Sequence, residues 1–188
     1  MNNSRRKFLT NTFIFLGIAL CPKSLKANEE IEEIIVQNEL KLFVPQQNQN
    51  YNILLETDTI SNTEYIIDSY EQVNKAFKDN RKNEVIDIDE NLILLLSKIS
   101  KKVGREKKIT ILSGYRTKET NTMLRKKGKK TAKKSYHMKG QAVDIRIDGV
   151  SVKKVAKIAR KLKLGGVGRY VKDGFVHVDT GPVRYWKG

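Results

Sequence analysis

The sequence has few of the residues that commonly hold small exported proteins together. Its 188 residues include one cysteine, Cys21, and two histidines, His137 and His177. A single cysteine excludes an intramolecular disulfide, so the fold must be held by its hydrophobic core. The apolar run from Phe13 to Leu20 is too short to span a bilayer comfortably.

Acidic residues are also scarce relative to basic ones. The chain has 37 lysines and arginines against 21 aspartates and glutamates, a formal net charge of +16. This excess favours an anionic partner or surface without identifying it. The 39% hydrophobic and 31% charged composition is typical of a soluble globular protein, and the length predicts one domain.

The N-terminus has the layout of an export signal. The adjacent arginines of "SRRKFL" precede the apolar run and resemble the twin-arginine signal, so we expect residues 1–27 to be removed after Ala27. A short amphipathic helix is the alternative. Cys21 raises the question of a lipoprotein signal, but the bulky Leu20 stands where such a signal has a small residue.

Removal of residues 1–27 would take away five basic residues and no acidic one, so the net charge would fall from +16 to +11. The remaining chain would have no cysteine and no stable membrane span. We predict a periplasmic protein with a short leader over 28–38 and one domain over 39–188. Outside the cytoplasm, cell-wall polymer or anionic lipid becomes the natural partner, and we expect no nucleic-acid partner.

Hydrophobic periodicity predicts an α+β fold with a largely antiparallel sheet and flanking helices. The expected strands are 39–45 and 51–57, which form a hairpin, then 109–112 and 142–147. The expected helices are 68–77, one after an Asp89 cap that ends at Gly104, 117–127, and one that runs from Ser151 to Leu162. "GGVGRY" is interpreted as a turn before a closing pair of strands, "FVHVDT" and "VRYW".

Both histidines lie near carboxylates in strand patterns. Alternation places His177 and Asp179 on one strand face, and Asp144 is flanked by apolar residues in "AVDIRI". His137 precedes that strand, and Gly140 lets its loop fold back tightly. We therefore predict a zinc cleft with His137, Asp144 and His177 as ligands. Two histidines and one carboxylate leave a fourth position open, as in catalytic zinc sites. The alternative is that both histidines are ordinary polar residues in turns.

The motifs "SGYRT", "SYHMKGQAVDI" and "GGVGRY…GFVHVDTGPVRYW" together resemble the murein endopeptidase K family, one of the zinc peptidases that act on the bacterial wall. The resemblance covers roughly Leu40 to Trp186. It implies the same three zinc ligands, and it implies that Arg116 binds substrate. A planar cation beside zinc also suits a peptide carbonyl or carboxylate, although a surface salt bridge is the alternative. Ser135 is expected to hold the loop of His137.

One position departs from the pattern of the wider zinc-peptidase group. Many of its members have an acid, the general base, three residues before the last histidine ligand, where this chain has Gly174. Asp179 is the candidate base because it shares the strand face of His177. The alternatives for Asp179 are support of His177 and formation of the following turn. Asp173 is a weaker candidate, one residue out of register.

The sequence thus predicts an exported zinc metallopeptidase that hydrolyses peptide cross-links of peptidoglycan, with Arg116 and Asp179 in catalytic roles and stem peptides as substrate. The bond would join either D-alanine and diaminopimelate or two diaminopimelates. A peptidoglycan-binding module that keeps the metal site without catalysis is the main alternative. A basic binder of nucleic acid or anionic membrane, with incidental histidines, is a third.

Overall fold

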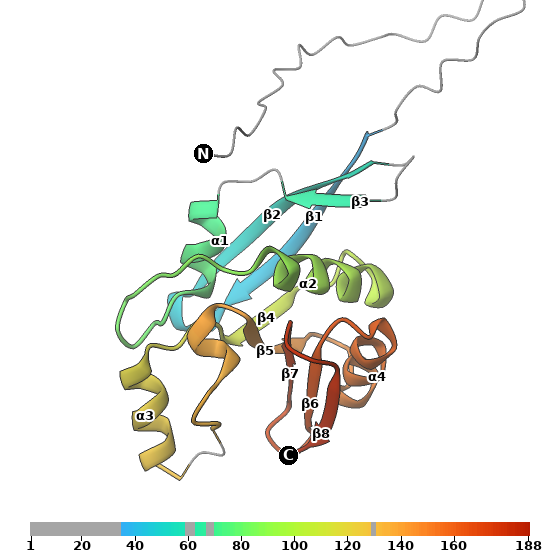
Figure 1. The fold of residues 1–188 in the computed structure, drawn as a ribbon. Helices are drawn as coiled ribbons and strands as arrows, with labels where there is room; N and C mark the ends of the chain where they lie inside the picture. Colours follow the sequence, from blue (N-terminus) through green and yellow to red (C-terminus); the bar gives the residue numbers. More distant parts are fainter. Residues whose placement is uncertain (1–34, 59–62, 67–69, 129–130) are drawn as a thin grey trace, which may run out of the picture. The chain divides into compact units, whose positions relative to one another are not determined.

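The computed structural model describes residues 35–58, 63–66, 70–128 and 131–188. Within these ranges, eight strands form one sheet in the order β3-β2-β1-β4-β5-β7-β6-β8 (Figure 1). The expected export signal, residues 1–27, lies outside the described residues. None of the helices in the described ranges is both long and apolar enough to traverse a bilayer.

The sheet begins with the predicted hairpin. Strand β1 (Ile35–Val44) pairs antiparallel with β2 (Gln49–Asp58), and the 3-10 helix η1 (Pro45–Gln47) connects them. β1 starts inside the segment 28–38 that we expected as a leader, and β3 (Thr63–Ile66), which pairs with β2, was not expected. Gln37, Asn38 and Glu39 are polar and none of them is buried, so hydrophobic periodicity does not mark this part of β1 as a strand.

The helices follow the sequence patterns closely. They are α1 (Tyr70–Phe77), α2 (Glu90–Val103), α3 (Lys118–Lys126) and α4 (Val152–Leu162). The Asp89 side chain accepts a hydrogen bond from the Asn91 N–H, and the Ser151 hydroxyl accepts one from the Lys154 N–H. Both predicted N-caps are therefore confirmed; such caps satisfy donors that the first helical turn leaves free.

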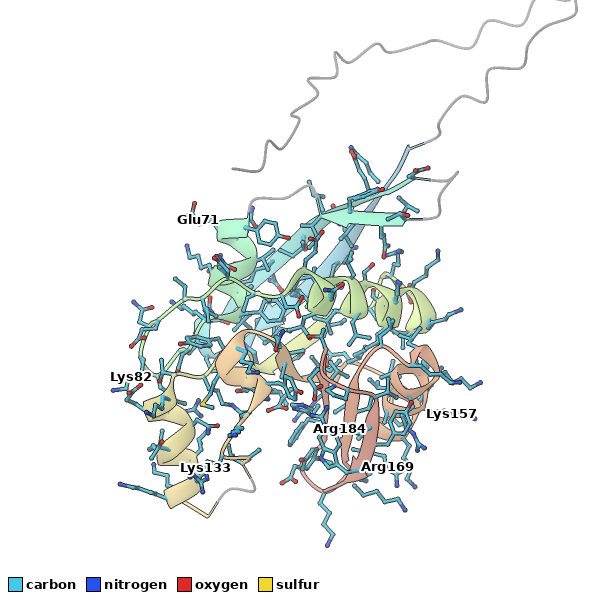
Figure 2. All side chains as sticks on the ribbon, in the orientation of Figure 1. Glu71, Lys82, Lys133, Lys157, Arg169 and Arg184 are labelled. Carbon is cyan, nitrogen blue, oxygen red and sulfur yellow. The ribbon has the colours of Figure 1, made fainter. Side chains whose placement is uncertain are left out.

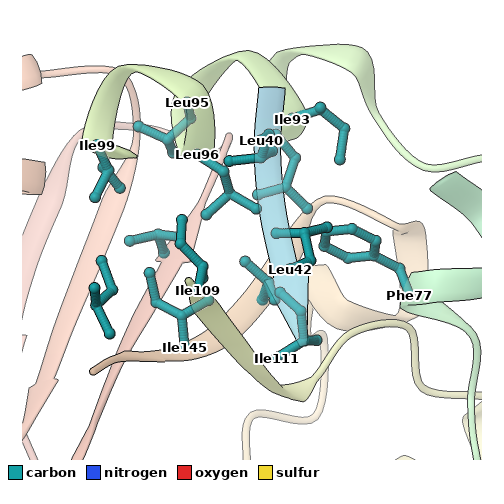
Figure 3. Close-up of a cluster of buried hydrophobic side chains, with 14 of the residues drawn as sticks. Leu40, Leu42, Phe77, Ile93, Leu95, Leu96, Ile99, Ile109, Ile111 and Ile145 are labelled. Atoms are coloured by element: carbon teal, nitrogen blue, oxygen red, sulfur yellow. The ribbon is translucent and has the colours of Figure 1, made fainter. Parts of the chain in front are cut away.

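One hydrophobic core joins these helices to the sheet. Leu92, Leu96 and Ile99 of α2 are fully buried, and they belong to the same cluster as residues of β1, β4 (Ile109–Ser113) and β5 (Ala142–Ile147) (Figure 3). Helix α4 adds its apolar face to this cluster and turns Lys157 outward (Figure 2). Removal of this apolar surface from water is the dominant stabilising contribution, as a disulfide-free chain requires.

The C-terminal strands differ from the expectation. "GGVGRY" is not a turn: Gly166–Tyr170 is strand β6, which lies between β7 (Phe175–Asp179) and β8 (Arg184–Lys187). The expected pairing of the last two strands is thus wrong. The glycines permit close packing, because a Cβ at Gly165 would overlap the Asp179 carbonyl and one at Gly168 would overlap the Trp186 ring.

The predicted α+β class with a mostly antiparallel sheet is confirmed. Of the pairings between neighbouring described strands, only β1–β4 and β6–β8 are parallel. The sheet brings β4, β5 and β7 together, and these three strands carry the polar residues that the sequence singled out.

Candidate metal centre and its cleft

Two of the three predicted ligands lie opposite each other on neighbouring strands. Asp144 of β5 is the direct pairing partner of His177 of β7, and Ser113 of β4 pairs with Asp144 on the other side. Cross-strand partners in an antiparallel pair share a face, with Cβ atoms about 4.5–5.5 Å apart. The strand register therefore brings Asp144 and His177 together.

The third ligand arrives on a short helical turn. His137 lies in the 3-10 helix η2 (Tyr136–Lys139), which is capped by Ser135 at its N-terminus and by Gly140 at its C-terminus. The Ser135 hydroxyl accepts a long hydrogen bond, 3.4 Å, from the His137 N–H, as the expected loop-holding role requires. Gly140 has φ 67°, and a Cβ there would lie 2.8 Å from the Asp87 carbonyl oxygen, so the tight fold-back needs glycine.

The loop after β4 fixes the His137 ring. His137 Nδ1 lies 2.7 Å from the Gly114 carbonyl oxygen, and the Arg116 N–H donates to the His137 carbonyl at 3.2 Å. Gly114 packs directly against the backbone of Phe77, where a Cβ would overlap the carbonyl oxygen. The "SGYR" and "SYHMKG" loops are thus joined into one unit behind the site.

The three predicted ligands converge on one point. Their ligand atoms all lie within 4.8 Å of one another. His137 Nε2 lies 3.2 Å from His177 Nδ1 and 3.3 Å from Asp144 Oδ1, and His177 Nδ1 lies 2.9 Å from Asp144 Oδ1. In tetrahedral zinc sites with bonds of about 2.0–2.1 Å, neighbouring ligand atoms are roughly 3.3 Å apart. The spacing fits a small tetrahedral cation.

The hydrogen bonds on the outer edges of the two rings test this fit. A carbonyl oxygen only accepts, so His137 Nδ1 carries the proton that it shares with Gly114, and Nε2 of the neutral ring presents a lone pair. His177 Nε2 lies 2.9 Å from Asp179 Oδ2, and donation to this carboxylate leaves a lone pair on Nδ1. A metal cation between the two rings would satisfy both lone pairs, which face each other at 3.2 Å in a buried site. The residues present fit a divalent metal.

Asp179 lies behind His177 rather than in front of it. Its carboxylate is fully buried and accepts hydrogen bonds from the backbone N–H groups of Gly166 and Gly181 and from both terminal nitrogens of Arg184. Burial raises the pKa of Asp179, but its hydrogen bonds to His177 and Arg184 outweigh this effect and lower the pKa to about 2. This carboxylate has little remaining capacity to accept a proton. Of the roles left open by the sequence, the geometry favours support of His177.

The guanidinium of Arg116 also bonds to residues of the candidate site. Its NH2 group pairs with Asp144 Oδ2, and its Nε donates to the Ser113 hydroxyl at 2.8 Å. Its side chain is 12% exposed, so it is not the surface salt bridge that we considered. Burial lowers the pKa of Arg116, and the neighbouring charge of Asp144 acts in the opposite direction. The guanidinium holds the carboxylate that faces both histidines.

Protonation of the two rings differs because their surroundings differ. Burial lowers the pKa of His137, and the charge of Arg116 adds to this effect. The neutral ring that results is the form that binds metals. Burial also lowers the pKa of His177, but hydrogen bonds to Asp144 and Asp179 outweigh it and raise the pKa. A metal would replace the proton that these two carboxylates attract.

The position three residues before His177 has a local structural role. Gly174 has φ 74° and ends the turn between β6 and β7, where its N–H donates to the Val171 carbonyl at 3.3 Å. A residue with a side chain is strained in this left-handed conformation. The neighbouring Asp173 is exposed and lines the cleft described next.

The candidate metal centre opens into a cleft of about 1010 Å³. Trp186 forms part of its wall, and its ring centroid lies 5.3 Å from that of His177. Arg184, labelled in Figure 2, lies between the rings of Tyr136 and Trp186, with its guanidinium carbon 5.0 and 5.1 Å from their centroids. Sequence reasoning missed Arg184, although the spacing "D-x-x-x-x-R" after His177 was a usable signal.

Comparisons with known proteins agree with these motifs. A family model described as peptidoglycan L,D-endopeptidase MepK matches residues 38–186. Peptidoglycan L,D-endopeptidase MepK of Escherichia coli (strain K12) is 41% identical over 122 residues, which cover 65% of this chain and 67% of the relative. Probable peptidoglycan L,D-endopeptidase MepK of Haemophilus influenzae is 35% identical over 189 residues, covering 100% of this chain and 98% of the relative. No solved structure matches the chain.

Proposed function

The chain belongs to the peptidoglycan L,D-endopeptidase MepK family, and from this premise we propose that it is a metal-dependent peptidoglycan endopeptidase. One observation carries the proposal: two imidazole nitrogens with lone pairs and one carboxylate oxygen converge at the floor of a cleft large enough for a peptide. The name of the relatives adds peptidoglycan as the substrate and an L,D bond as the bond cleaved. We propose that this bond lies in the peptide cross-links between stem peptides.

We assign the metal to His137, Asp144 and His177 and propose zinc, because two histidines and one carboxylate are a common ligand set of catalytic zinc. When bound there, zinc polarises the scissile carbonyl and lowers the pKa of the attacking water. The cleft wall formed by Trp186 and Tyr136 would hold the peptide over the site.

The residues around the ligands are assigned supporting roles. Arg116 holds Asp144 in the orientation in which one carboxylate oxygen faces both histidines. Asp179 accepts a hydrogen bond from the N–H at Nε2 of His177 and so leaves the lone pair on Nδ1 for the metal, and Arg184 holds Asp179 through two nitrogens. Such carboxylate–histidine–metal arrangements orient the ring and raise its basicity.

We further propose that the protein acts outside the cytoplasm, since its proposed substrate is the wall. Residues 1–27 would serve as the export signal, and the adjacent arginines of "SRRKFL" favour the twin-arginine route. Fusion of residues 1–27 to a reporter that is active only when exported folded would test this route, with Arg5 and Arg6 both changed to lysine as the control.

A second candidate, a binding module that keeps the metal site without turnover, is favoured by one observation. The wider group's acid position holds Gly174, and Asp179 is engaged by hydrogen bonds behind His177. The two candidates differ in whether metal-loaded protein changes its substrate.

Digestion of purified sacculi separates them. We expect wild-type protein with zinc to convert cross-linked muropeptide dimers into monomers, and the fragment masses to identify the bond. The His177→Ala variant should leave the dimers intact. Dimers that survive folded, zinc-loaded wild-type protein would support the binding module instead.

A further inference from the structure

Three arginines line the cleft, and Arg81, unlike Arg116 and Arg184, has no ion-pair partner among the residues that the structure describes. Arg81 is exposed and lines the same cleft as the metal centre. Its guanidinium forms no ion pair with any carboxylate in the ranges that the structure describes. Arg116, in contrast, is bound to Asp144 and Ser113. Arg81 is therefore the arginine of the cleft that is free to meet a substrate; the exposed Lys134 and Lys172 also line the cleft but lack a planar guanidinium.

The backbone that carries Arg81 is fixed to the site by a buried carboxylate. Asp79, only 1% exposed, accepts from the Arg81 N–H at 3.0 Å through one oxygen. Its other oxygen accepts from the Thr117 N–H at 2.9 Å and from the Thr117 hydroxyl at 3.1 Å. Thr117 directly follows Arg116 and caps α3. Asp79 thus ties the turn of Arg81 to the loop of Arg116.

The turn itself is closed by backbone pairing. The Asp79 N–H donates to the Glu84 carbonyl at 2.8 Å, and the Tyr115 N–H donates to the Phe77 carbonyl at 2.7 Å. Lys82, the neighbour of Arg81 in this turn, is labelled in Figure 2 near the start of α3. A turn held on both sides presents Arg81 at a fixed place, which reduces the ordering cost of binding a ligand.

Two positive charges are held near each other by this arrangement. The charge of Arg81 is one of the effects that lower the pKa of Arg116, after burial and against the opposing effect of Asp144. Arg81 and Ser113 also line a smaller hollow of about 200 Å³ beside the cleft, together with Lys78 and Asn80. The wall next to the metal centre is thus rich in donors and positive charge.

A carboxylate group of the substrate would suit this wall. Arginine binds carboxylates through two parallel hydrogen bonds. An L,D bond joins the carbonyl of an L-centre to the amine of a D-centre. If the D-centre belongs to diaminopimelate, it keeps its own carboxyl group one carbon away from the scissile nitrogen. A cation beside the metal centre is placed to recognise that group.

We propose that Arg81 is the substrate-carboxylate receptor of the cleft: it binds the free carboxylate of the diaminopimelate on the amine side of the cross-link, while Arg116 serves the metal site. This inference rests on the proposed function for its substrate class. The proposal implies that the cleft distinguishes substrates with a free carboxylate at this position from substrates in which it is amidated.

Binding of uncross-linked stem peptides tests the proposal without any turnover. The probes are muropeptide monomers with diaminopimelate, in one form with the free carboxylate at the D-centre and in the other with its amide. Dissociation constants would be measured by calorimetry on full-length protein loaded with zinc. The variants are Arg81→Gln and Arg81→Lys. Lys101→Gln, at an exposed position of α2, is the control with the same change of charge as Arg81→Gln.

We expect wild-type protein to bind the free-carboxylate monomer about tenfold or more tightly than the amide, the usual value of a hydrogen-bonded charge. Arg81→Gln should remove this preference by weakening only the free-carboxylate form. Arg81→Lys should be intermediate, because it keeps the charge without the paired donors. Lys101→Gln should behave as wild type. The thermal midpoint of Arg81→Gln should match wild type, since the Asp79 contact uses the backbone.

The proposal is overturned if Arg81→Gln keeps the preference, or if it weakens both monomers equally. The result is independent of catalysis. A protein that discriminates the monomers through Arg81 but leaves dimers uncut would refute the proposed peptidase activity and keep the carboxylate receptor. A protein that cuts dimers but whose preference between the two monomers does not depend on Arg81 would support the peptidase activity and refute the carboxylate receptor.

Discussion

His177 and Asp179, two residues apart on strand β7, are joined through the outer nitrogen of the histidine ring. Nε2 of His177 lies 2.9 Å from the buried Asp179 carboxylate, whereas Nδ1 faces Asp144 and His137. Strand alternation places both side chains on one face, and the fully buried aspartate is held there by Arg184 and two backbone N–H groups. This relationship supports the proposed positioning role of Asp179 and gives the first prediction.

Replacement of Asp179 by asparagine should act mainly by weakening metal binding. The variant loses the charge that fixes the His177 ring, so we expect zinc affinity to fall about tenfold to 100-fold. Competition with a chromogenic chelator would measure it. Asp173→Asn, in the exposed turn before the same strand, is the control and should retain wild-type affinity. Unchanged affinity with lost turnover in Asp179→Asn would instead make Asp179 the general base.

Variants of Arg116 and Arg81 should differ in zinc affinity in the same assay. Arg116→Gln removes the partner of Asp144, so its zinc affinity should fall at least about tenfold. Arg81→Gln removes no contact of any ligand and should change zinc affinity less than about twofold. Equal zinc affinities for wild type and Arg116→Gln would show that Arg116 does not support the metal site.

Gly114 connects packing to the metal centre. A methyl group there would overlap the Phe77 carbonyl and displace the loop whose own carbonyl holds His137. We expect Gly114→Ala to lower the free energy of unfolding by about 1–3 kcal/mol, as overpacked sites do, and also to weaken zinc binding. Urea titration and the chelator assay would measure the two effects. A variant with wild-type stability and wild-type zinc affinity would contradict this packing argument.

The surroundings of Asp89 should make part of the free energy of unfolding depend on pH. Burial raises its pKa, but hydrogen bonds from Thr180, Asn91 and Gln141 outweigh this effect and lower the pKa. A lowered folded-state pKa gives stability that is present above the unfolded value, about 3.9, and is lost as the pH falls through the folded value.

We therefore expect Asp89→Ala to cost about 1–2 kcal/mol at pH 6, through the lost cap and the lost bond to Thr180. The difference from wild type should shrink as the pH falls below about 4. Urea unfolding followed by circular dichroism at pH 6 and pH 3 would measure it. Asp148→Ala, in an exposed turn, should show no comparable change. If the difference in unfolding free energy between wild type and Asp89→Ala does not change with pH, the charge of Asp89 is not the source of its stabilising effect.

The strong local patterns made much of the fold predictable. Leu92, Leu96 and Ile99 recur at helical spacing, and Asp89 and Ser151 cap helices as expected. The resemblance to the murein endopeptidase K family is confirmed by the family match. Strand β6 was missed because the glycines of "GGVGRY" are typical of a turn. Their role is instead close packing: a Cβ at Gly165, just before β6, would overlap the Asp179 carbonyl, and one at Gly168 would overlap the Trp186 ring.

The sequence predicted which residues meet at the candidate site, but not how their side chains are oriented. Alternation placed His177 and Asp179 on one face, but it could not say which edge of the imidazole ring the aspartate meets. Nor could it show that Asp144 forms an ion pair with Arg116, or that Asp79, which carries the turn of Arg81, bonds to Thr117 across 37 intervening residues. These contacts join segments far apart in the chain. Such long-range pairing has no local signature.

The most direct test of the central claim is zinc titration of turnover. Metal-free protein, prepared with a chelator that is then removed, would be given a purified cross-linked muropeptide dimer and increasing zinc, with monomer release followed by mass spectrometry. We predict no release without metal, a linear rise, and a plateau at about one zinc per chain, with no recovery in His137→Ala. Release that is equal with and without metal, or no release from a folded protein that has bound its zinc, would contradict the account.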